Sequence, residues 1–195
     1  MGKIFCILGK SGSGKDTIFG HLKRDKDLNL LPIIGYTTRP MRKNETHGIE
    51  YFFITNNELE NYKNLRKIIE VRSYDTVNGK WYYGTIDDGQ IELNKNNYLF
   101  ISTLEAYKSL IKYFGKNNII PIYINLDDGV RLERALVREK KQINPNFNEL
   151  CRRFLADDID FSYNNLKECR INKFYENYDL HECLEEIKKD IKKYL

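Results

Sequence analysis

The 195-residue chain has few residues of the types that mark secreted or metal-binding proteins. Its four cysteines, Cys6, Cys151, Cys169 and Cys183, show no paired spacing of the zinc or redox kind. Disulfide frameworks and zinc sites depend on such spacing, so we expect four reduced cysteines. The three histidines are dispersed and form no ligand pair, and we interpret them as ordinary surface or core residues.

Long hydrophobic runs are also missing. No stretch approaches about 18 apolar residues, the length that a membrane-spanning helix needs. The first residues run straight into an expected strand, without a basic segment followed by a long apolar one. We therefore expect a cytoplasmic protein with no membrane partner.

An excess of one charge sign is absent as well. The 32 lysines and arginines and the 28 aspartates and glutamates leave a net charge of +4, and the basic residues are scattered. A nucleic-acid-binding surface needs a basic patch or stripe, so we expect no nucleic-acid partner. The length suffices for one well-buried domain, no Pro/Gly/Ser-rich linker divides the chain, and both a monomer and a homodimer stay open.

Short apolar runs alternate with segments of helical spacing along most of the chain. The runs cover residues 3–8, 98–102 and 119–125, and helices are expected at 17–26, 104–114, 130–141 and 180–195. Continuous apolar strands separated by amphipathic helices are typical of a parallel sheet covered on both faces. The pattern predicts a doubly wound α/β fold.

Residues 35–95 follow a different pattern. A short strand is expected at 50–54, and Asn78-Gly79, flanked by strand-forming residues, is a β-hairpin signal. We interpret this segment as an insertion rather than another strand-helix repeat.

The most informative segment is glycine-rich and lies between the first expected strand and the first expected helix. It reads Gly9-Lys10-Ser11-Gly12-Ser13-Gly14-Lys15-Asp16-Thr17. Glycines let the backbone approach phosphate oxygens, the amides at a helix start attract an anion, and the lysine supplies a cation. We expect nucleotide phosphates to be bound by Gly9, Ser11, Gly12, Ser13, Gly14, Lys15, Asp16 and Thr17. Asp16 stands where Ser or Thr usually follows the lysine, and the hydroxyl comes one residue later.

A second basic segment opens the insertion. Residues 36–51 hold two arginines, Arg39 and Arg42, around Pro40. An arginine fork can bind phosphate oxygens in pairs, and proline stiffens the loop that carries it. On this stretch alone, a solvated basic loop is an equally good interpretation.

Together the two segments resemble the guanylate kinase family of nucleoside monophosphate (NMP) kinases. The matching residues are Thr37, Thr38, Arg39, Arg42, Glu45, Gly48 and Tyr51. The resemblance continues through Glu70 and residues 82–85, and through residues 131–138 and 151–154, which are similar to the family's lid and the arginine after it. It spans the chain from the phosphate loop to about residue 160.

The resemblance implies a fold, an activity and ligands. The fold would be a P-loop three-layer α/β domain with a central parallel sheet. Its core would comprise residues 1–34 and 96–195, with an NMP-binding insertion at 35–95 and a helical lid at about 131–152. The activity would be ATP-dependent, Mg²⁺-assisted phosphoryl transfer to GMP or dGMP as small-molecule nucleotide substrates.

The resemblance also implies roles for individual residues. Acceptor binding would fall to Thr38, Arg39, Arg42, Glu45, Tyr51, Glu70, Tyr82 and Thr103, and catalysis to Lys15, Arg39, Arg42, Arg138 and Arg153. Arg134 would approach ATP, and Thr17 would serve the metal, directly or through water. Arg152 and Arg153 are adjacent on an expected helix and cannot both point inward, and Arg153 is favoured. No general base is required, because a nucleotide phosphate, with a second pKa of about 6, is already ionised.

Two departures from the family pattern concern the base. Gly35-Tyr36 replaces a pair of serines, and Ile101-Ser102-Thr103 replaces an Asp-x-Asp. A kinase for another acceptor, such as another nucleotide or ribose 1,5-bisphosphate, therefore stays open. So does a non-catalytic guanylate-kinase-like interaction module. A GTP-hydrolysing switch is disfavoured, because we find no strand-end Asp-x-x-Gly and no Asn-Lys-x-Asp.

Overall fold

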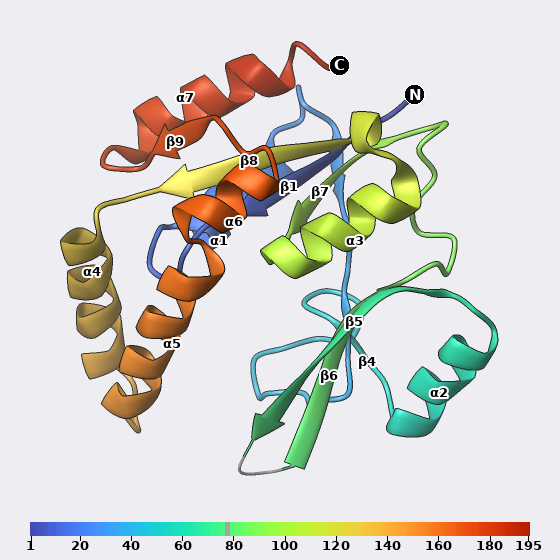
Figure 1. The fold of residues 1–195 in the computed structure, drawn as a ribbon, viewed down its shortest axis with the longest axis horizontal. Helices are drawn as coiled ribbons and strands as arrows, with labels where there is room; N and C mark the ends of the chain where they lie inside the picture. The colour runs from blue at the N-terminus through green and yellow to red at the C-terminus, as the bar shows by residue number, and fades with distance from the viewer. Residues whose placement is uncertain (77–78) are drawn as a thin grey trace.

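A computed structural model describes residues 1–76 and 79–195 (Figure 1). A five-stranded sheet forms its centre in the order β2-β7-β1-β8-β9, and all of its strand pairs are parallel. The strands are β1 (Ile4–Leu8), β2 (Leu30–Pro32), β7 (Asn97–Ile101), β8 (Ile119–Asn125) and β9 (Phe174–Glu176). The predicted α/β fold with a central parallel sheet is confirmed.

Helices lie on both sides of this sheet and beyond its end (Figure 1). They are α1 (Lys15–Arg24), α2 (Asn56–Asn64), α3 (Leu104–Phe114), α4 (Asp128–Lys140), α5 (Phe147–Asp160), α6 (Tyr163–Glu168) and α7 (Leu180–Ile191), with a short 3₁₀ turn at Lys116–Asn118. Three of the four expected helices have other boundaries, including the one expected at 130–141, which covers Asp128–Lys140. The helix expected from residue 17 begins at Lys15, directly after the left-handed Gly14, and the C-terminal helix ends at Ile191.

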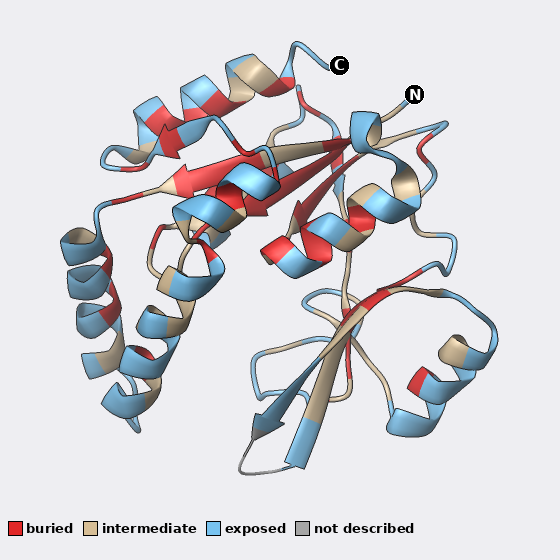
Figure 2. Cartoon of the chain, in the orientation of Figure 1, coloured by how far each residue is buried: buried red, intermediate tan, exposed pale blue. Residues whose placement is uncertain are grey.

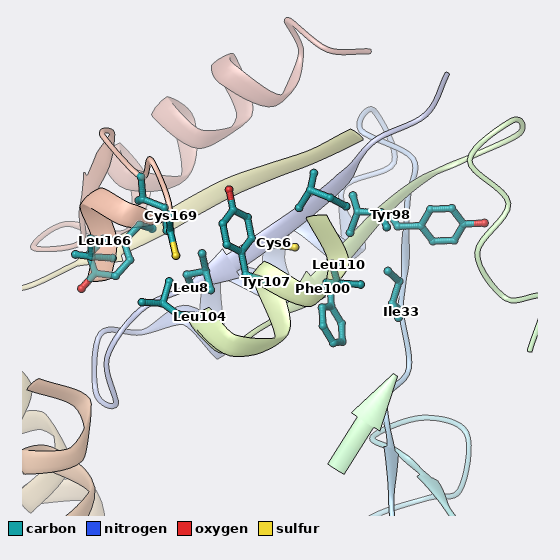
Figure 3. Close-up of a cluster of buried hydrophobic side chains, with 14 of the residues drawn as sticks. Cys6, Leu8, Ile33, Tyr98, Phe100, Leu104, Tyr107, Leu110, Leu166 and Cys169 are labelled. Carbon is teal, nitrogen blue, oxygen red and sulfur yellow. The ribbon is translucent and has the colours of Figure 1, made fainter. Parts of the chain in front are cut away.

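Strand β1 explains why the core has two halves. All five of its residues are buried, and alternate side chains point to opposite faces of a sheet. Ile4, Cys6 and Leu8 join the cluster that contains residues of α3 and α6 (Figure 3). Phe5 and Ile7 join a second cluster with residues of α1 and α7. An uninterrupted apolar strand is therefore what a sheet covered on both faces requires.

A second, four-stranded sheet lies apart from the first, in the order β4-β3-β6-β5. Its strands are β3 (Tyr36–Thr37), β4 (Phe52–Phe53), β5 (Ile68–Thr76) and β6 (Gly79–Ile86). The strand expected at 50–54 is thus shorter. Strands β5 and β6 pair antiparallel, as the hairpin signal predicted, while Asn78 of that signal lies outside the described residues. Burial is concentrated in the parallel sheet, and this second part is more exposed (Figure 2).

Helices α4 and α5 pack against each other and extend together beyond the end of the parallel sheet (Figure 1). They contain most of the segment expected as a lid. Within the described parts of the chain, no helix has the length and apolar character to cross a membrane. All four cysteines are free, as expected.

The α3 face of the core yields a stability prediction. Leu110 is fully buried in the α3 cluster, so Leu110→Ala leaves a cavity and should lower the free energy of unfolding by about 3 kcal/mol. The measurement is urea denaturation followed by circular dichroism. The exposed Lys112→Ala on the same helix should change it by less than about 0.5 kcal/mol. Equal effects of the two changes would contradict the packing described.

Candidate functional site

The glycine-rich loop between β1 and α1 is closely packed against two distant segments. Gly12 and Gly14 have φ of 84° and 90°, in the left-handed region. A Cβ at Gly14 would lie 2.3 Å from Nδ2 of Asn177, and one at Gly12 would lie 2.8 Å from the carbonyl oxygen of Arg131. Both the backbone conformation and the available space therefore require glycine.

Three side chains from later elements hold this loop. Asn177 Nδ2 donates to the carbonyl of Ser13 at 2.7 Å, and Arg131 Nη1 donates to the carbonyl of Ser11 at 2.9 Å. The backbone N–H of Ser11 donates to Oδ2 of Asp157 at 2.6 Å. Sequence analysis missed Asn177 and Asp157, which lie more than a hundred positions from the loop and carry no local signal.

The Arg131 guanidinium is buried, with 1% of its side chain exposed, yet it is charged. Its Nη2 and Nε donate to Oδ1 of Asp128 at 2.7 Å and 3.0 Å, and Nη2 lies 3.5 Å from Oδ1 of Asp158. Its Cζ lies 4.5 Å from the centre of the Phe154 ring, on which the guanidinium stacks. Lys10 Nζ lies 2.6 Å from the same Asp158 oxygen. A buried charge needs such partners, so this cluster fixes the base of α4 and α5 against the loop.

The start of α1 has the features of an anion site. Lys15 is the first helical residue, followed by the exposed Asp16 and Thr17. Among the described residues, the Ser13 hydroxyl is buried without a hydrogen-bond partner. Buried polar groups are normally satisfied, so this hydroxyl is available to a ligand. Helix N-terminal amides and a lysine favour a phosphate there.

Arg39 is the centre of a second cluster, in the insertion. It is 4% exposed, and its Nη1 and Nη2 each donate to a different oxygen of Glu45 at 2.7 Å. Its Nε donates to the hydroxyl of Tyr83 at 3.2 Å. The Tyr51 ring centre lies 5.5 Å from Cζ of Arg39 and 5.7 Å from the Tyr83 ring centre. The structure thus brings together Arg39, Glu45 and Tyr51 of the expected residues.

The electrostatics of this cluster follow from its contacts. The hydrogen bonds from Arg39 lower the pKa of Glu45 from its ordinary 4.5 to about 2, and the same contact raises the pKa of Arg39. Burial raises the pKa of Tyr51, and the charge of Asp16 in α1 adds to that effect. The phenol therefore remains a hydrogen-bond donor at neutral pH.

Tyr83, rather than the expected Tyr82, belongs to this cluster. Neighbouring residues of a strand point to opposite faces, so only one of the two can contact Arg39. The Tyr82 ring instead faces Lys63 of α2, whose Nζ lies 5.4 Å from the ring centre. The Tyr82 carbonyl accepts from the Thr38 N–H, and the Tyr82 N–H donates to the Thr38 hydroxyl. The sequence expectation for Tyr82 is corrected, because the phase of β6 depends on its register with β5 and β3.

Two other residues expected to bind the acceptor, Arg42 and Thr38, contact residues in or next to the Arg39 cluster. The backbone N–H of Arg42 donates to Glu45 at 2.8 Å, while its side chain is exposed. Thr38 fixes β6 by accepting the Tyr82 N–H at 3.0 Å through its hydroxyl. The arginine is therefore available to a ligand, and the threonine has a structural contact.

Glu70 and Thr103 meet through a residue that sequence analysis missed. Arg72 donates from Nε to Oε2 of Glu70 at 2.9 Å and from Nη1 to the Thr103 hydroxyl at 2.9 Å. The Thr85 hydroxyl donates to the other Glu70 oxygen at 3.0 Å. A signal was present, since residues two apart in a strand share a face. Thr103 also caps α3 by accepting the Ala106 N–H.

The arginines of α4 and α5 divide between two places. Arg138 and Arg153 line a cavity of about 20 Å³ together with Ser11 of the loop. Arg134 Nη2 donates to the carbonyl of Asn177 at 3.3 Å. Both Arg152 and Arg153 reach Glu149, but of these two only Arg153 lines the cavity. Of the two, Arg153 is thus the one that lies near the loop.

Known proteins resemble this chain over nearly its whole length. Residues 1–194 match a family model described as guanylate kinase. The guanylate kinase of Porphyromonas gingivalis is 27% identical, over 100% of this chain and 99% of that protein. That of Mycoplasmoides gallisepticum is 31% identical, over 99% and 93%. The crystal structure of guanylate kinase from Anaplasma phagocytophilum has a TM-score of 0.67 at 17% identity, covers 98% of this chain and 85% of that chain, and shows the same fold.

The Arg39–Glu45 pair generates a pH prediction. Glu45→Gln should lower the free energy of unfolding at pH 7 by about 2 kcal/mol, the range of charge-assisted hydrogen bonds. Because the pKa of Glu45 is about 2 when folded and near 4.5 when unfolded, wild type should lose this advantage as the pH falls from 4.5 towards 2. Urea titrations at several pH values measure the difference. The exposed Glu60→Gln serves as control, and a difference that stays constant down to pH 2 would contradict the pairing.

Proposed function

The chain belongs to the guanylate kinase family, since the family model spans residues 1–194, and we propose that it transfers the γ-phosphoryl group of ATP to GMP or dGMP. One observation carries the proposal. The chain has two separate clusters with the chemistry for phosphate, the loop at 9–17 with its unpartnered Ser13 hydroxyl and the cluster of Arg39, Tyr51 and Tyr83. Two phosphates held near each other are what phosphoryl transfer needs.

The loop is the proposed ATP site. The backbone amides at the start of α1 and the Ser13 hydroxyl would hold phosphate oxygens, and Lys15 would neutralise their charge. The geometry fits, because the contacts of Arg131 and Asn177 fix the loop through its carbonyl groups. The other N–H groups of the loop are left for the anion, except at Ser11, whose N–H donates to Asp157, and at Ser13, whose N–H donates to the Lys10 carbonyl at 3.2 Å.

The insertion is the proposed acceptor site. Arg39 already uses four of its five N–H groups within the protein, so it acts mainly as the rigid centre of the site. Arg42 has an exposed side chain, and Tyr51 and Tyr83 have phenol groups beside Arg39. We assign these three side chains to the acceptor phosphate, which is the nucleophile.

The arginines of α4 and α5 would stabilise the charge of the transferring group. Arg138 and Arg153 line one cavity with the loop residue Ser11, and Arg134 lies at Asn177, which also contacts the loop. Cations brought to a developing charge in a site without water account for much of such catalysis. Closure of these helices over ATP would supply them.

Magnesium fits this site as part of the ATP complex. Among residues 1–76 and 79–195, no group of three or more His, Cys, Asp or Glu residues is arranged to hold a metal. Mg²⁺ in kinase sites is typically held by one or two protein ligands, water and the substrate phosphates. Thr17, with Asp16 beside it, has the oxygen chemistry for this role. When bound, Mg²⁺ would neutralise the phosphate charge.

Two alternatives remain distinct from this proposal. A non-catalytic module has no need of a glycine loop that is closely packed or of arginines that meet at one cavity, so these features favour an enzyme. One observation favours a kinase for another acceptor. Arg72 and Thr85 already donate hydrogen bonds to both oxygens of Glu70, the residue expected to bind guanine. An ADP-release assay with Mg-ATP and a panel of GMP, dGMP, AMP, CMP, UMP, dTMP and ribose 1,5-bisphosphate separates the alternatives.

Lys15→Ala tests the donor half. We expect kcat for GMP phosphorylation to fall at least about 100-fold, because the variant removes a cation from the transferring phosphates while the core stays packed. Coupled ADP release measures kcat, and circular dichroism checks the fold. The matched control is Lys23→Ala, an exposed lysine on the same helix, which should turn over normally. Normal turnover by Lys15→Ala would refute the assignment of the loop.

Tyr83→Phe and Tyr82→Phe form a matched pair for the acceptor half. Loss of the Tyr83 hydroxyl should raise KM for GMP about tenfold, the effect of one hydrogen bond of about 1.4 kcal/mol, with KM for ATP unchanged. Tyr82→Phe should leave both constants unchanged, because its phenol lies on the other face of β6. Steady-state kinetics with each substrate varied gives the four values. The reverse result would restore Tyr82 to the site.

A further inference from the structure

The structure contains a cavity that lies outside both proposed phosphate sites. Its volume is about 410 Å³, within the range of small-molecule binding sites. The described residues that line it belong to β1, β8, β9 and α7, to the segment at 170–173 before β9, and to the chain after α7. None of these lining residues is one that we assign to ATP, to the acceptor or to the transferring group.

The strand pairing at the sheet edge explains why this space is open. Strand β9 pairs with residues 123–125, the last three of β8. Along the first part of β8 the described chain supplies no strand on that side, and Ile120 and Ile122 line the cavity. Phe5 and Ile122 belong to the core cluster that contains residues of α1 and α7, and the ring centre of Tyr194 lies 6.0 Å from that of Phe5. The floor of the cavity is therefore apolar and aromatic.

Arg170, at the rim of this cavity, has an unfavourable backbone conformation. Its φ is 55°, in the left-handed region, and its N–H donates to the carbonyl of Lys167 at the end of α6. Glycine is the preferred residue at such a helix end, because it has no Cβ. The Arg170 side chain is exposed and, among the described residues, has no hydrogen bond or ion pair. An arginine that is unfavourable for the backbone and makes no internal contact points to a ligand.

The other two cations of the lining are already paired. Lys173 and Lys193 both donate to the Asp190 carboxylate, and Lys173 Nζ also lies 2.7 Å from Oε1 of Glu186. The hydrogen bonds from the two lysines lower the pKa of Asp190, so this carboxyl group is ionised at neutral pH. Two carboxylates thus balance two lysines, and the charge of Arg170 is left over.

We propose that this cavity binds an aromatic monocarboxylate. The carboxylate lies on the free Arg170 guanidinium, whose planar fork can donate two parallel hydrogen bonds to it. The ring lies against Phe5, Ile120 and Tyr194. An apolar cavity with few, precisely placed polar groups is the usual composition of a small-molecule site. The cavity is separate from the proposed transfer reaction, so this ligand is additional to its substrates.

The charge of the lining selects the anion. One surplus positive charge matches the single negative charge of a carboxylate, whereas a phosphate monoester brings nearly two. A cationic ligand would meet an unpaired arginine, and a neutral one would leave that arginine without a partner.

The test uses two probes of one shape, 2-naphthoate and its neutral amide, 2-naphthamide. Their Kd values are measured by isothermal titration calorimetry on the full chain, with Mg-ADP present to occupy the proposed ATP site. The variant is Arg170→Gly and the matched control is Arg66→Gly. Arg66 has φ of 56°, is exposed and follows the end of α2, so both variants relieve a left-handed residue and remove one charge. Of the two arginines, Arg170 is the one that lines the cavity.

We expect wild type to bind naphthoate at least about tenfold more tightly than naphthamide, the effect of one charge-assisted hydrogen bond or more. Arg170→Gly should raise the Kd for naphthoate at least about tenfold and leave that for naphthamide within about twofold. Arg66→Gly should leave both values unchanged. Glycine suits the backbone at both positions, so the variants should melt no lower than wild type in circular dichroism.

Three results would overturn the inference. They are equal affinities of wild type for the two probes, equal effects of Arg170→Gly and Arg66→Gly on naphthoate binding, and no binding of naphthoate by wild type at about 1 mM. Each would leave the proposed kinase activity standing, because the cavity shares no residue with the proposed sites for ATP and the acceptor.

Discussion

The structure depends on one buried cation, the Arg131 guanidinium. It joins the carbonyl of Ser11 in the phosphate loop to Asp128 at the start of α4 and, through Asp158, to α5. A charge that is almost fully buried is stable only with such partners, and removing one partner leaves an uncompensated charge. The loop, whose amides would bind ATP, is therefore fixed by the same group that fixes α4 and α5, the two helices that carry Arg134, Arg138 and Arg153.

The proposed acceptor side follows a similar logic with paired charges. Arg39 is held by Glu45 and Arg72 by Glu70, so both guanidinium groups have defined positions before any ligand binds. The arginines of α4 and α5 differ, because Arg153 is half exposed and its ion pair with Glu149 is long, at 3.3 Å. This contrast matches two tasks. Recognition of an acceptor needs rigid groups, whereas charge stabilisation during transfer needs groups that approach late.

Sequence reasoning succeeded where the signal is local. The loop at 9–17 combines glycine spacing, a lysine and a strand-to-helix setting, and α3 was placed at residues 104–114 because its apolar spacing and its boundaries are clear. It failed where the answer depended on register. Tyr82 and Tyr83 are adjacent aromatic residues, and they point to opposite faces of the sheet. Which face each one occupies is set by the register of β6, in which Tyr83 pairs with Thr37 of β3 and with Arg72 of β5. No local pattern contains that information.

The sequence by itself determined the parallel α/β core, the phosphate loop and the family resemblance, because each is encoded by residues close together in the chain. Only the tertiary structure decided which side chains surround the loop and Glu70. Asn177, Asp157 and Arg131 contact the loop although they lie more than a hundred residues from it. Arg72 contacts Glu70 on its own strand and Thr103 at the start of α3. Such contacts form when the core packs. A buried polar group then needs a hydrogen-bond partner, and that partner is whichever group lies next to it in the folded chain, however distant in sequence.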